Sequence, residues 1–332
     1  MFGWFKTKKP TNKSAKAKCD WKSSKAHLLM LSKFIQPQAP ERFQNDPNWK
    51  EVLGESPRDA LRMMRSDGML RPCEIQELLE AKFKVSEMKQ MLKAAGLKVS
   101  GRKAEQAERL IENDLAGARQ AVGDFFALRC TNEGEDLSVS FLAEQEKERE
   151  SAEAAAFAKL KEHKFKEAAS IVTNFEKDQV FSRGIGIDWS DAYPARQAHQ
   201  LEMIFKNIPK ILSGIDEHTF HDLRIAAGMM ELWGTNSAKA WFPKGIETES
   251  HLESDAAARM LLFHARHMDD LQGYKKEGFK KIQVMGVDDN NQCEACQALD
   301  GKSFPIKKVP ELPLANCTCE IGCRCLYSVD LD

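Results

Sequence analysis

Six of the nine cysteines in the chain gather near its C-terminal end, where they could hold a metal ion. Cys293 and Cys296 form a Cys-x-x-Cys pair, which brings two thiolates onto one tight turn. Four more cysteines follow: Cys317, Cys319, Cys323 and Cys325. A structural zinc ion needs four ligands at the corners of a tetrahedron, usually from two closely spaced pairs. The sequence therefore predicts a structural zinc site at the Cys-x-x-Cys pair and two later cysteines, with Cys317 and either Cys323 or Cys325 favoured.

Two other uses of these cysteines stay open: an iron–sulfur cluster, or free and redox-labile thiols in a small terminal lobe. Residues 276–332 contain no histidine, which argues against a Cys₂His₂ site. Six neighbouring thiolates also leave little room for the open position of a catalytic zinc ion. His264 and His267 precede Asp269 and Asp270 on a predicted helix, but no third metal ligand stands at a recognisable spacing. We interpret these four residues as a solvated helix face.

A second group of chemically suited residues lies in segment 83–113, where basic side chains outnumber acidic ones. The pattern predicts a helix that ends at Gly96, an extended loop with a turn at Gly101, and a second helix from about Ala104 to Glu112. Backbone amides at the start of the second helix and the nearby cations suit the phosphate backbone of DNA. The candidate DNA-binding residues are Lys89, Lys93, Lys98, Ser100, Gly101, Arg102, Lys103 and Arg109.

Segment 83–113 resembles the SAP family of DNA-binding modules. The family pattern has Lys-x-x-Gly-Leu at the end of the first helix, Ser-Gly-x-Lys in the loop and Glu-Arg-Leu in the second helix. The matching residues are Lys93, Gly96, Leu97, Ser100, Gly101, Lys103, Glu108, Arg109 and Leu110. Gln106 stands where the family usually has leucine, and Leu97 and Val99 are expected to face the core. The resemblance implies binding to double-stranded DNA through the second helix and the loop before it.

The cysteine segment carries a second pattern, Cys-x-x-Cys-x-x-Leu-Asp-Gly-Lys-x-Phe, and closes on Cys-Arg-Cys. The C-terminal ~60 residues thereby resemble the end of the phage head-morphogenesis (minor head protein) family. The matching residues are Cys293, Cys296, Leu299, Asp300, Gly301, Lys302, Phe304, Cys323, Arg324 and Cys325. The family usually has His-Pro-Asn before its last Cys-Arg-Cys, where this chain has the extra pair Cys317 and Cys319. The resemblance implies a role in head assembly or DNA packaging and a metal site with an altered ligand set.

The composition supports a folded soluble protein. Of the 332 residues, 42% are hydrophobic and 30% are charged. The formal net charge is −1, yet residues 1–25 hold eight lysines and one acidic residue, so the charge is unevenly distributed. The chain has no apolar run long enough for a membrane-spanning helix and no signal-peptide core. We therefore expect no membrane association and a reducing compartment: the cytoplasm, at the nucleoid in a bacterium, or the nucleus in a eukaryote.

The elements that must position these residues are mainly α-helical, with a small cysteine-rich β lobe that resembles a zinc ribbon. The predicted organisation is a disordered basic tail at 1–25, a helical lead-in at 26–82, the SAP-like module at 83–113, a helical region at 115–275 and the cysteine lobe at 276–332. Apolar periodicity predicts helices near 56–68, 74–81, 196–212, 217–233 and 254–272, and a long helix or a helical pair over 142–176. Phe279–Val287 is the one strand expected before the cysteines.

These observations favour a non-enzymatic protein that binds duplex DNA through the SAP-like module and carries a structural zinc lobe. A phage or prophage accessory of head assembly or DNA packaging is the first alternative. The second is an enzyme in the helical middle that the SAP-like module tethers to DNA. Glycine-rich phosphate loops, a Gly-x-Ser-x-Gly turn and His-Glu-x-x-His are all absent, and no catalytic residue is identified. For residues 115–275 the sequence suggests only a surface for protein partners.

Overall fold

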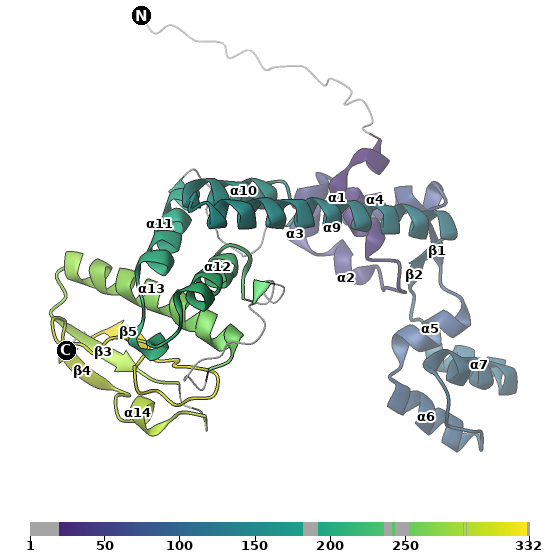
Figure 1. Ribbon diagram of the computed structural model, residues 1–332. Helices are drawn as coiled ribbons and strands as arrows, with labels where there is room; N and C mark the ends of the chain where they lie inside the picture. Colours follow the sequence, from purple (N-terminus) through teal and green to yellow (C-terminus); the bar gives the residue numbers. More distant parts are fainter. Residues whose placement is uncertain are drawn as a thin grey trace, which may run out of the picture. The chain divides into compact units, whose positions relative to one another are not determined.

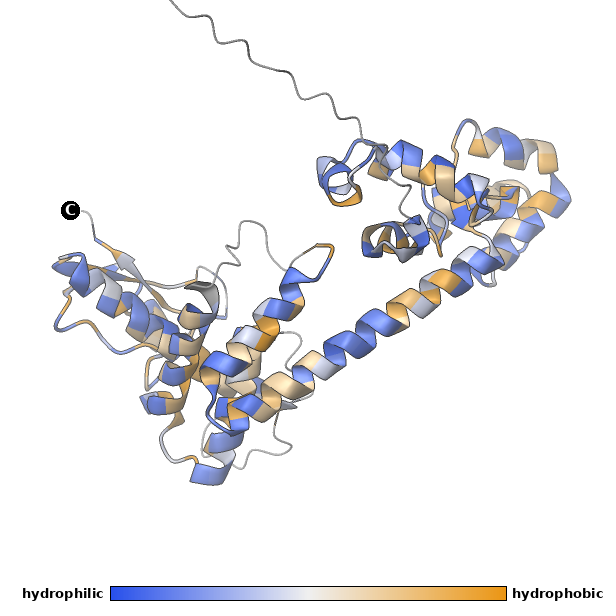
Figure 2. Cartoon of the chain, turned by 90° about the horizontal axis from the view of Figure 1, so that it is seen from above, coloured by the Kyte–Doolittle hydropathy of each residue, from blue (hydrophilic) through white to orange (hydrophobic). Residues whose placement is uncertain are grey.

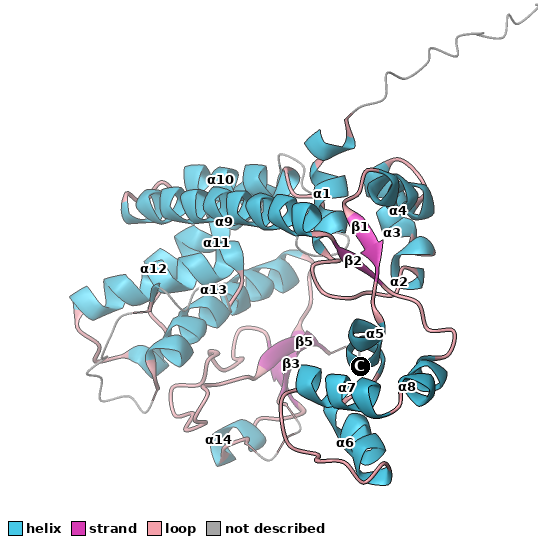
Figure 3. Ribbon diagram, turned by 90° about the vertical axis from the view of Figure 1, so that its right-hand side faces the viewer, coloured by secondary structure: helices cyan, strands magenta, loops and turns pink. Residues whose placement is uncertain are grey.

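The computed structural model describes residues 20–181, 192–235, 241–242, 252–287, 289 and 291–330. It is mainly helical, as the sequence predicts, and has two small antiparallel sheets (Figures 1 and 3). The chain forms two compact units, Met1–Lys147 and Glu148–Asp332. Residues 1–19, which make up most of the predicted basic tail, lie outside the described part of the chain.

Unit 1 begins with short helical elements around an apolar core. These are η1 (Trp21–Ser23), α1 (Lys25–Ser32), α2 (Glu41–Gln44), α3 (Pro47–Leu53) and α4 (Pro57–Ser66). Trp21 is only 5% exposed, and its indole Nε1 donates a hydrogen bond to Asp67 Oδ2 at 2.7 Å. The prediction that the solvated tail runs to residue 25 is therefore wrong at its end, because the buried Trp21 side chain, bonded to the residue that follows α4, already belongs to the fold.

A two-stranded ribbon closes the base of a helical insertion in unit 1. Strand β1 (Leu70–Pro72) pairs antiparallel with β2 (Leu128–Cys130) (Figure 3). In this register Arg71 lies opposite Arg129. Between the two strands the chain forms α5 (Ile75–Lys82), α6 (Val85–Ala94), α7 (Lys103–Asn113) and α8 (Leu115–Val122). Glu77 of α5 lies within 2.7 Å of Arg71 and 2.9 Å of Arg129. This carboxylate compensates two like charges that would otherwise repel each other across the ribbon.

Helix α9 (Asn132–Lys161) begins in unit 1 and ends in unit 2. Its middle, residues 142–151, is almost entirely exposed and hydrophilic (Figure 2). His163 adopts a left-handed conformation with a φ of 57°, and α10 (Phe165–Lys177) follows. The region predicted as one long helix or a helical pair is thus a pair. Among the described residues, no helix combines the length and apolar character required to cross a bilayer.

The remaining elements of unit 2 are helices followed by a small sheet. They are α11 (Ala192–Lys206), η2 (Lys210–Leu212), α12 (Glu217–Trp233), α13 (Ser254–Lys276), β3 (Lys281–Met285), α14 (Glu294–Gln297), β4 (Lys302–Pro305) and β5 (Leu326–Val329). The strand order is β4-β3-β5, with both pairs antiparallel. Helix α12 packs closely on its neighbours, because a Cβ at Gly228 would lie 3.1 Å from Leu160 and 3.3 Å from Leu201.

One apolar core joins the helices of unit 2 to the cysteine-rich end of the chain. Ile282, Val284 and Tyr327 belong to the same buried cluster as the apolar residues of α12 and α13. The predicted cysteine lobe at 276–332 and the part of the predicted helical region from Glu148 onward therefore share a core in unit 2, whereas residues 115–147 belong to unit 1.

The two histidines of α13 lie at this junction rather than on a solvated face. His264 is 5% exposed, and its Nδ1 lies 2.9 Å from the carbonyl oxygen of Leu312. The His267 ring packs edge-on against Tyr327, and burial lowers its pKa to about 4. The interpretation of His264 and His267 as solvated is wrong, because the cysteine lobe covers that side of the helix.

The ion pairs of Glu77 predict a pH-dependent contribution to stability. Hydrogen bonds from Arg71, and then from the Glu74 amide and Arg129, lower the Glu77 pKa from 4.5 to about 2 against the opposing effect of burial. A depressed carboxyl pKa stabilises the folded protein fully above pH 4.5, and this stabilisation is lost as the pH falls toward 2. In urea unfolding at pH 7, Glu77→Gln will be less stable than the wild type.

The difference between the two proteins will shrink between pH 4.5 and 2 as the wild type loses the charge on Glu77. Glu112→Gln, at an exposed position of α7, is the matched control and will leave stability almost unchanged. A Glu77→Gln difference that stays constant over that interval would contradict the role of the ion pairs.

Candidate nucleic-acid interface and metal centre

Helices α6 and α7 form a hairpin whose core is completed by the helices on either side. Met88 and Leu92 of α6 and Ala107 of α7 are fully buried. The same cluster contains Leu79 from α5 and Val122 from α8. Two helices of this length bury little apolar surface by themselves, so the flanking helices supply part of the packing that keeps the hairpin in place.

The loop between α6 and α7 is held to α7 by side-chain hydrogen bonds. Gly96 ends α6 in the left-handed region with a φ of 68°, and Gly101 has a φ of 119°. The buried Gln106 amide donates from Nε2 to the carbonyl oxygens of Val99 (3.2 Å) and Gly101 (2.9 Å). Glutamine at this position satisfies two loop carbonyls that a leucine would leave without these partners, while its own Oε1 is buried with no hydrogen-bond partner among the described residues.

Arg109 is also engaged with the loop. Its guanidinium donates to the carbonyl oxygens of Lys98 and Ser100 and is only partly exposed. Arg109, predicted to bind DNA, thus holds in place the loop backbone that carries Lys98. Val99, by contrast, is 40% exposed. The expectation that its side chain faces the core is wrong, since its carbonyl accepts the Gln106 bond while the side chain faces solvent.

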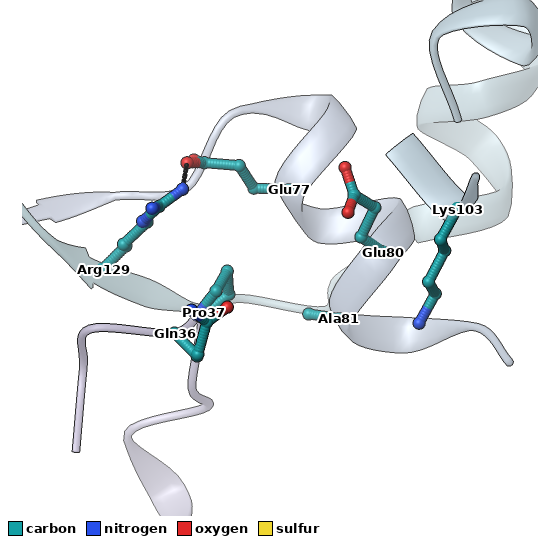
Figure 4. Close-up of a pocket in the computed structure, with 7 residues that line it drawn as sticks. All are labelled: Gln36, Pro37, Glu77, Glu80, Ala81, Lys103 and Arg129. Atoms are coloured by element: carbon teal, nitrogen blue, oxygen red, sulfur yellow. Dashed lines mark hydrogen bonds and ion pairs between the residues drawn. The ribbon is translucent and has the colours of Figure 1, made fainter. Parts of the chain in front are cut away.

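The other predicted DNA-binding residues differ in their exposure to solvent. Those at the surface are Lys89, Lys93, Lys98, Ser100, Gly101 and Arg102. Lys103 is half-buried and lines a pocket of about 330 Å³ that it shares with Glu77 and Glu80 (Figure 4). The side chain of Glu105 accepts a hydrogen bond from the amide of Arg102, the residue before α7, at 3.2 Å. The accessible surface therefore consists mainly of the exposed cations of α6 and the loop.

Sequence reasoning did not single out a basic stripe on α4. Arg58, Arg62 and Arg65 line a depression of about 450 Å³ together with Phe126 and Leu128. The signal was present, because positions i, i+4 and i+7 of a helix share one face. The partner Asp59 lies 2.8 Å from Arg62, with both side chains largely exposed.

Comparison with known protein families gave a match for the segment that contains the α6–α7 hairpin. Residues 81–114 match the family model of the SAP domain. This confirms the resemblance of residues 83–113. We refer to the matched residues as the SAP segment. None of the curated proteins or solved structures gave a significant match to the chain.

The six C-terminal cysteines meet in one cluster in unit 2. Cys293 caps α14 and Cys296 lies within it, while the other four come from the segment before β5. The Cys296 Sγ atom lies 3.6 Å from that of Cys317 and 3.9 Å from those of Cys319 and Cys323. These separations match the edge of a tetrahedral zinc–thiolate site, about 3.8 Å for Zn–S bonds of about 2.3 Å. All eight cysteines described are free thiols, so the donor set fits a metal ion.

Backbone amides and neighbouring thiols stabilise thiolates in this cluster. The amides of Thr318 and Cys293 donate to the sulfurs of Cys293 (3.4 Å) and Cys319 (3.2 Å). Burial alone would raise the pKa of Cys293, but hydrogen bonds from Thr318 and nearby cysteines lower it to about 6. Hydrogen bonds from the Cys317 and Cys325 thiols likewise hold the Cys323 pKa far below its usual range. The partnership with Cys323 raises the pKa of Cys317 and Cys325, and burial raises that of Cys296. Cys293 and Cys323 are therefore favoured as thiolates before a metal ion binds, and the other thiols would release their protons on coordination.

The loop contacts of Gln106 predict a measurable loss of stability. Replacing Gln106 with alanine leaves the carbonyls of Val99 and Gly101 without this partner and opens space in the core. We expect the free energy of unfolding of unit 1 to fall by about 1–3 kcal/mol in urea titrations. Gln90→Ala, at an exposed position of α6, is the control and will change little. Equal effects of the two substitutions would show that the amide bonds do not hold the loop.

Removal of metal will affect the helices of unit 2 as well as the cysteine lobe. Because five of the clustered cysteines belong to the same core as α12 and α13, chelation will increase hydrogen exchange in Glu217–Trp233 and Ser254–Lys276. Exchange in the SAP segment will stay unchanged, since its apolar cluster is a different one. Chelation that leaves both helices as protected as before would contradict a structural role for the metal.

Proposed function

We propose that this protein binds duplex DNA through the exposed cations of the SAP segment and that its thiol cluster holds structural zinc. The observation that carries the DNA proposal is a match to the SAP domain in a segment whose Lys89, Lys93, Lys98 and Arg102 are exposed. Cations on a rigid backbone contact phosphates without reading base edges. Binding is then weakly sequence-specific and strongly salt-dependent, because each phosphate contact releases counterions.

A single helical hairpin makes few phosphate contacts, so the SAP segment is suited to tethering a larger protein to DNA. In this role unit 2 acts as the attached body, and zinc stabilises its core without taking part in catalysis. Zinc would be held by thiolates of the Cys293–Cys325 cluster, whose donor type and spacing suit this ion. The described cysteines are all free thiols, which supports a protein that acts in a reducing compartment, the cytoplasm or the nucleus.

A second candidate is a phage accessory protein of head assembly or DNA packaging. It is supported by the Leu-Asp-Gly-Lys-x-Phe run, which makes the turn and strand that close the cysteine lobe. Asp300 Oδ1 accepts from the Gly286 amide at 2.7 Å, and the Gly301 amide donates to Val284 at 2.9 Å. In this role the protein from infected cells would sediment with assembled heads, and sedimentation with host DNA alone would contradict it.

The salt dependence of DNA binding tests the proposal. Substituting Lys93, Lys98 and Arg102 with glutamine removes up to three phosphate contacts. The slope of log affinity against log salt concentration should then flatten by about 2–3 units, as measured by fluorescence anisotropy with duplex DNA.

The matched control changes Lys166, Lys206 and Lys276 to glutamine. These exposed residues of unit 2 carry the same total charge but lie outside the SAP segment. The control variant should keep the wild-type slope. If the two triple variants change the slope equally, general surface charge and not the SAP segment is responsible for binding.

A further inference from the structure

The six sulfurs of the cysteine cluster fall into two overlapping groups. Cys293, Cys296, Cys317 and Cys319 have sulfur atoms that all lie within 4.8 Å of one another. Cys296, Cys323 and Cys325 form a second such group. Cys296 belongs to both, which places its thiol between two potential metal positions.

Cys317 also interacts with both groups. Its sulfur is 3.6 Å from Cys296 and 3.9 Å from Cys293. Cys317 lies outside the 4.8 Å limit of the second group, but its thiol has a hydrogen-bond partner there in Cys323. Cys296 and Cys317 thus form a central pair, with Cys293 and Cys319 beside it in the first group.

The number of thiols matches a two-metal arrangement. Two tetrahedra that share one edge have six corners: two that are shared and four that are not. A single four-coordinate ion would leave two of the six thiols unused. Cys323 and Cys325 are only 1% and 3% exposed, so as spare thiols they would remain buried beside the thiolate of Cys296. Sharing two thiolates gives every cysteine of the cluster a metal partner.

We propose that the lobe holds two zinc ions bridged by the thiolates of Cys296 and Cys317, with Cys293 and Cys319 completing one site and Cys323 and Cys325 the other. This inference rests on the proposed structural zinc and changes its number and ligand set. Binding two Zn²⁺ displaces up to six thiol protons and leaves a cluster charge of −2, with no oxidation or reduction. The Arg324 guanidinium is ion-paired with Asp289 and interacts less strongly with Cys319 and Cys296, so it offsets only a part of that charge.

Metal stoichiometry of the full-length protein tests this inference. Protein saturated with Zn²⁺ and then desalted should contain about two zinc ions per chain by elemental analysis and native mass spectrometry. Cys325→Ala removes a terminal ligand of one site, and Cys293→Ala removes a terminal ligand of the other. Each variant should retain about one tightly bound zinc ion. Cys73→Ala, at a free cysteine of unit 1, is the control and should retain two.

Cobalt substitution tests the bridges without any variant that could fail to fold. As a second equivalent of Co²⁺ binds the wild-type protein, thiolate bridges will couple the two ions magnetically. The electron paramagnetic resonance signal per cobalt should therefore fall, whereas two unbridged ions would give a constant signal per cobalt.

The outcomes separate this inference from the proposed function. One zinc ion in the wild type, retained in Cys325→Ala, would overturn the two-metal cluster and leave the structural zinc proposal standing. No bound zinc, or the visible absorption of an iron–sulfur cluster, would overturn both zinc proposals. DNA affinity is measured separately, so either result leaves the role of the SAP segment intact.

Discussion

The SAP hairpin and the cysteine lobe are both too short to bury a core of their own, and the fold depends on neighbouring helices that complete the two cores. Helices α6 and α7 pack Met88 and Leu92 against Leu79 of α5 and Val122 of α8. The cysteine lobe shares its core with α12 and α13, where its five most buried thiols lie among apolar side chains. Each module is therefore stable only as part of its unit.

This packing explains how each site is prepared for a ligand. In unit 1, Gln106 and Arg109 donate hydrogen bonds to the four carbonyls of residues 98–101, and these bonds fix the backbone that carries Lys98 and Arg102. Little conformational entropy is then lost when the loop contacts phosphates. In unit 2, the core holds the thiols at separations close to those of a zinc–thiolate tetrahedron. The proposed zinc would stabilise the sulfur charges that burial opposes.

Local signals allowed the sequence to predict the SAP hairpin and the membership of the thiol cluster. Gly96 and Gly101 mark the turns because they adopt positive φ, and the cysteine spacing marks the sulfurs that lie together. Long-range contacts could not be predicted in this way. Trp21 bonds to Asp67, 46 residues later, and the three-residue strands β1 and β2 form only as a pair. The His267 ring packs against Tyr327, which comes from a distant part of the sequence. Propensity and periodicity carry no information about such partners.

The central claim is that the loop and exposed face of the SAP segment contact DNA. Its most direct test is residue-specific nuclear magnetic resonance of the labelled full-length protein during titration with a short duplex. The amides of Lys98–Lys103 and of the Lys89–Lys93 stretch should show the largest shifts, and these should diminish as salt is added. Shifts confined to unit 2, or no shift in the SAP segment at DNA concentrations that saturate binding, would contradict the account.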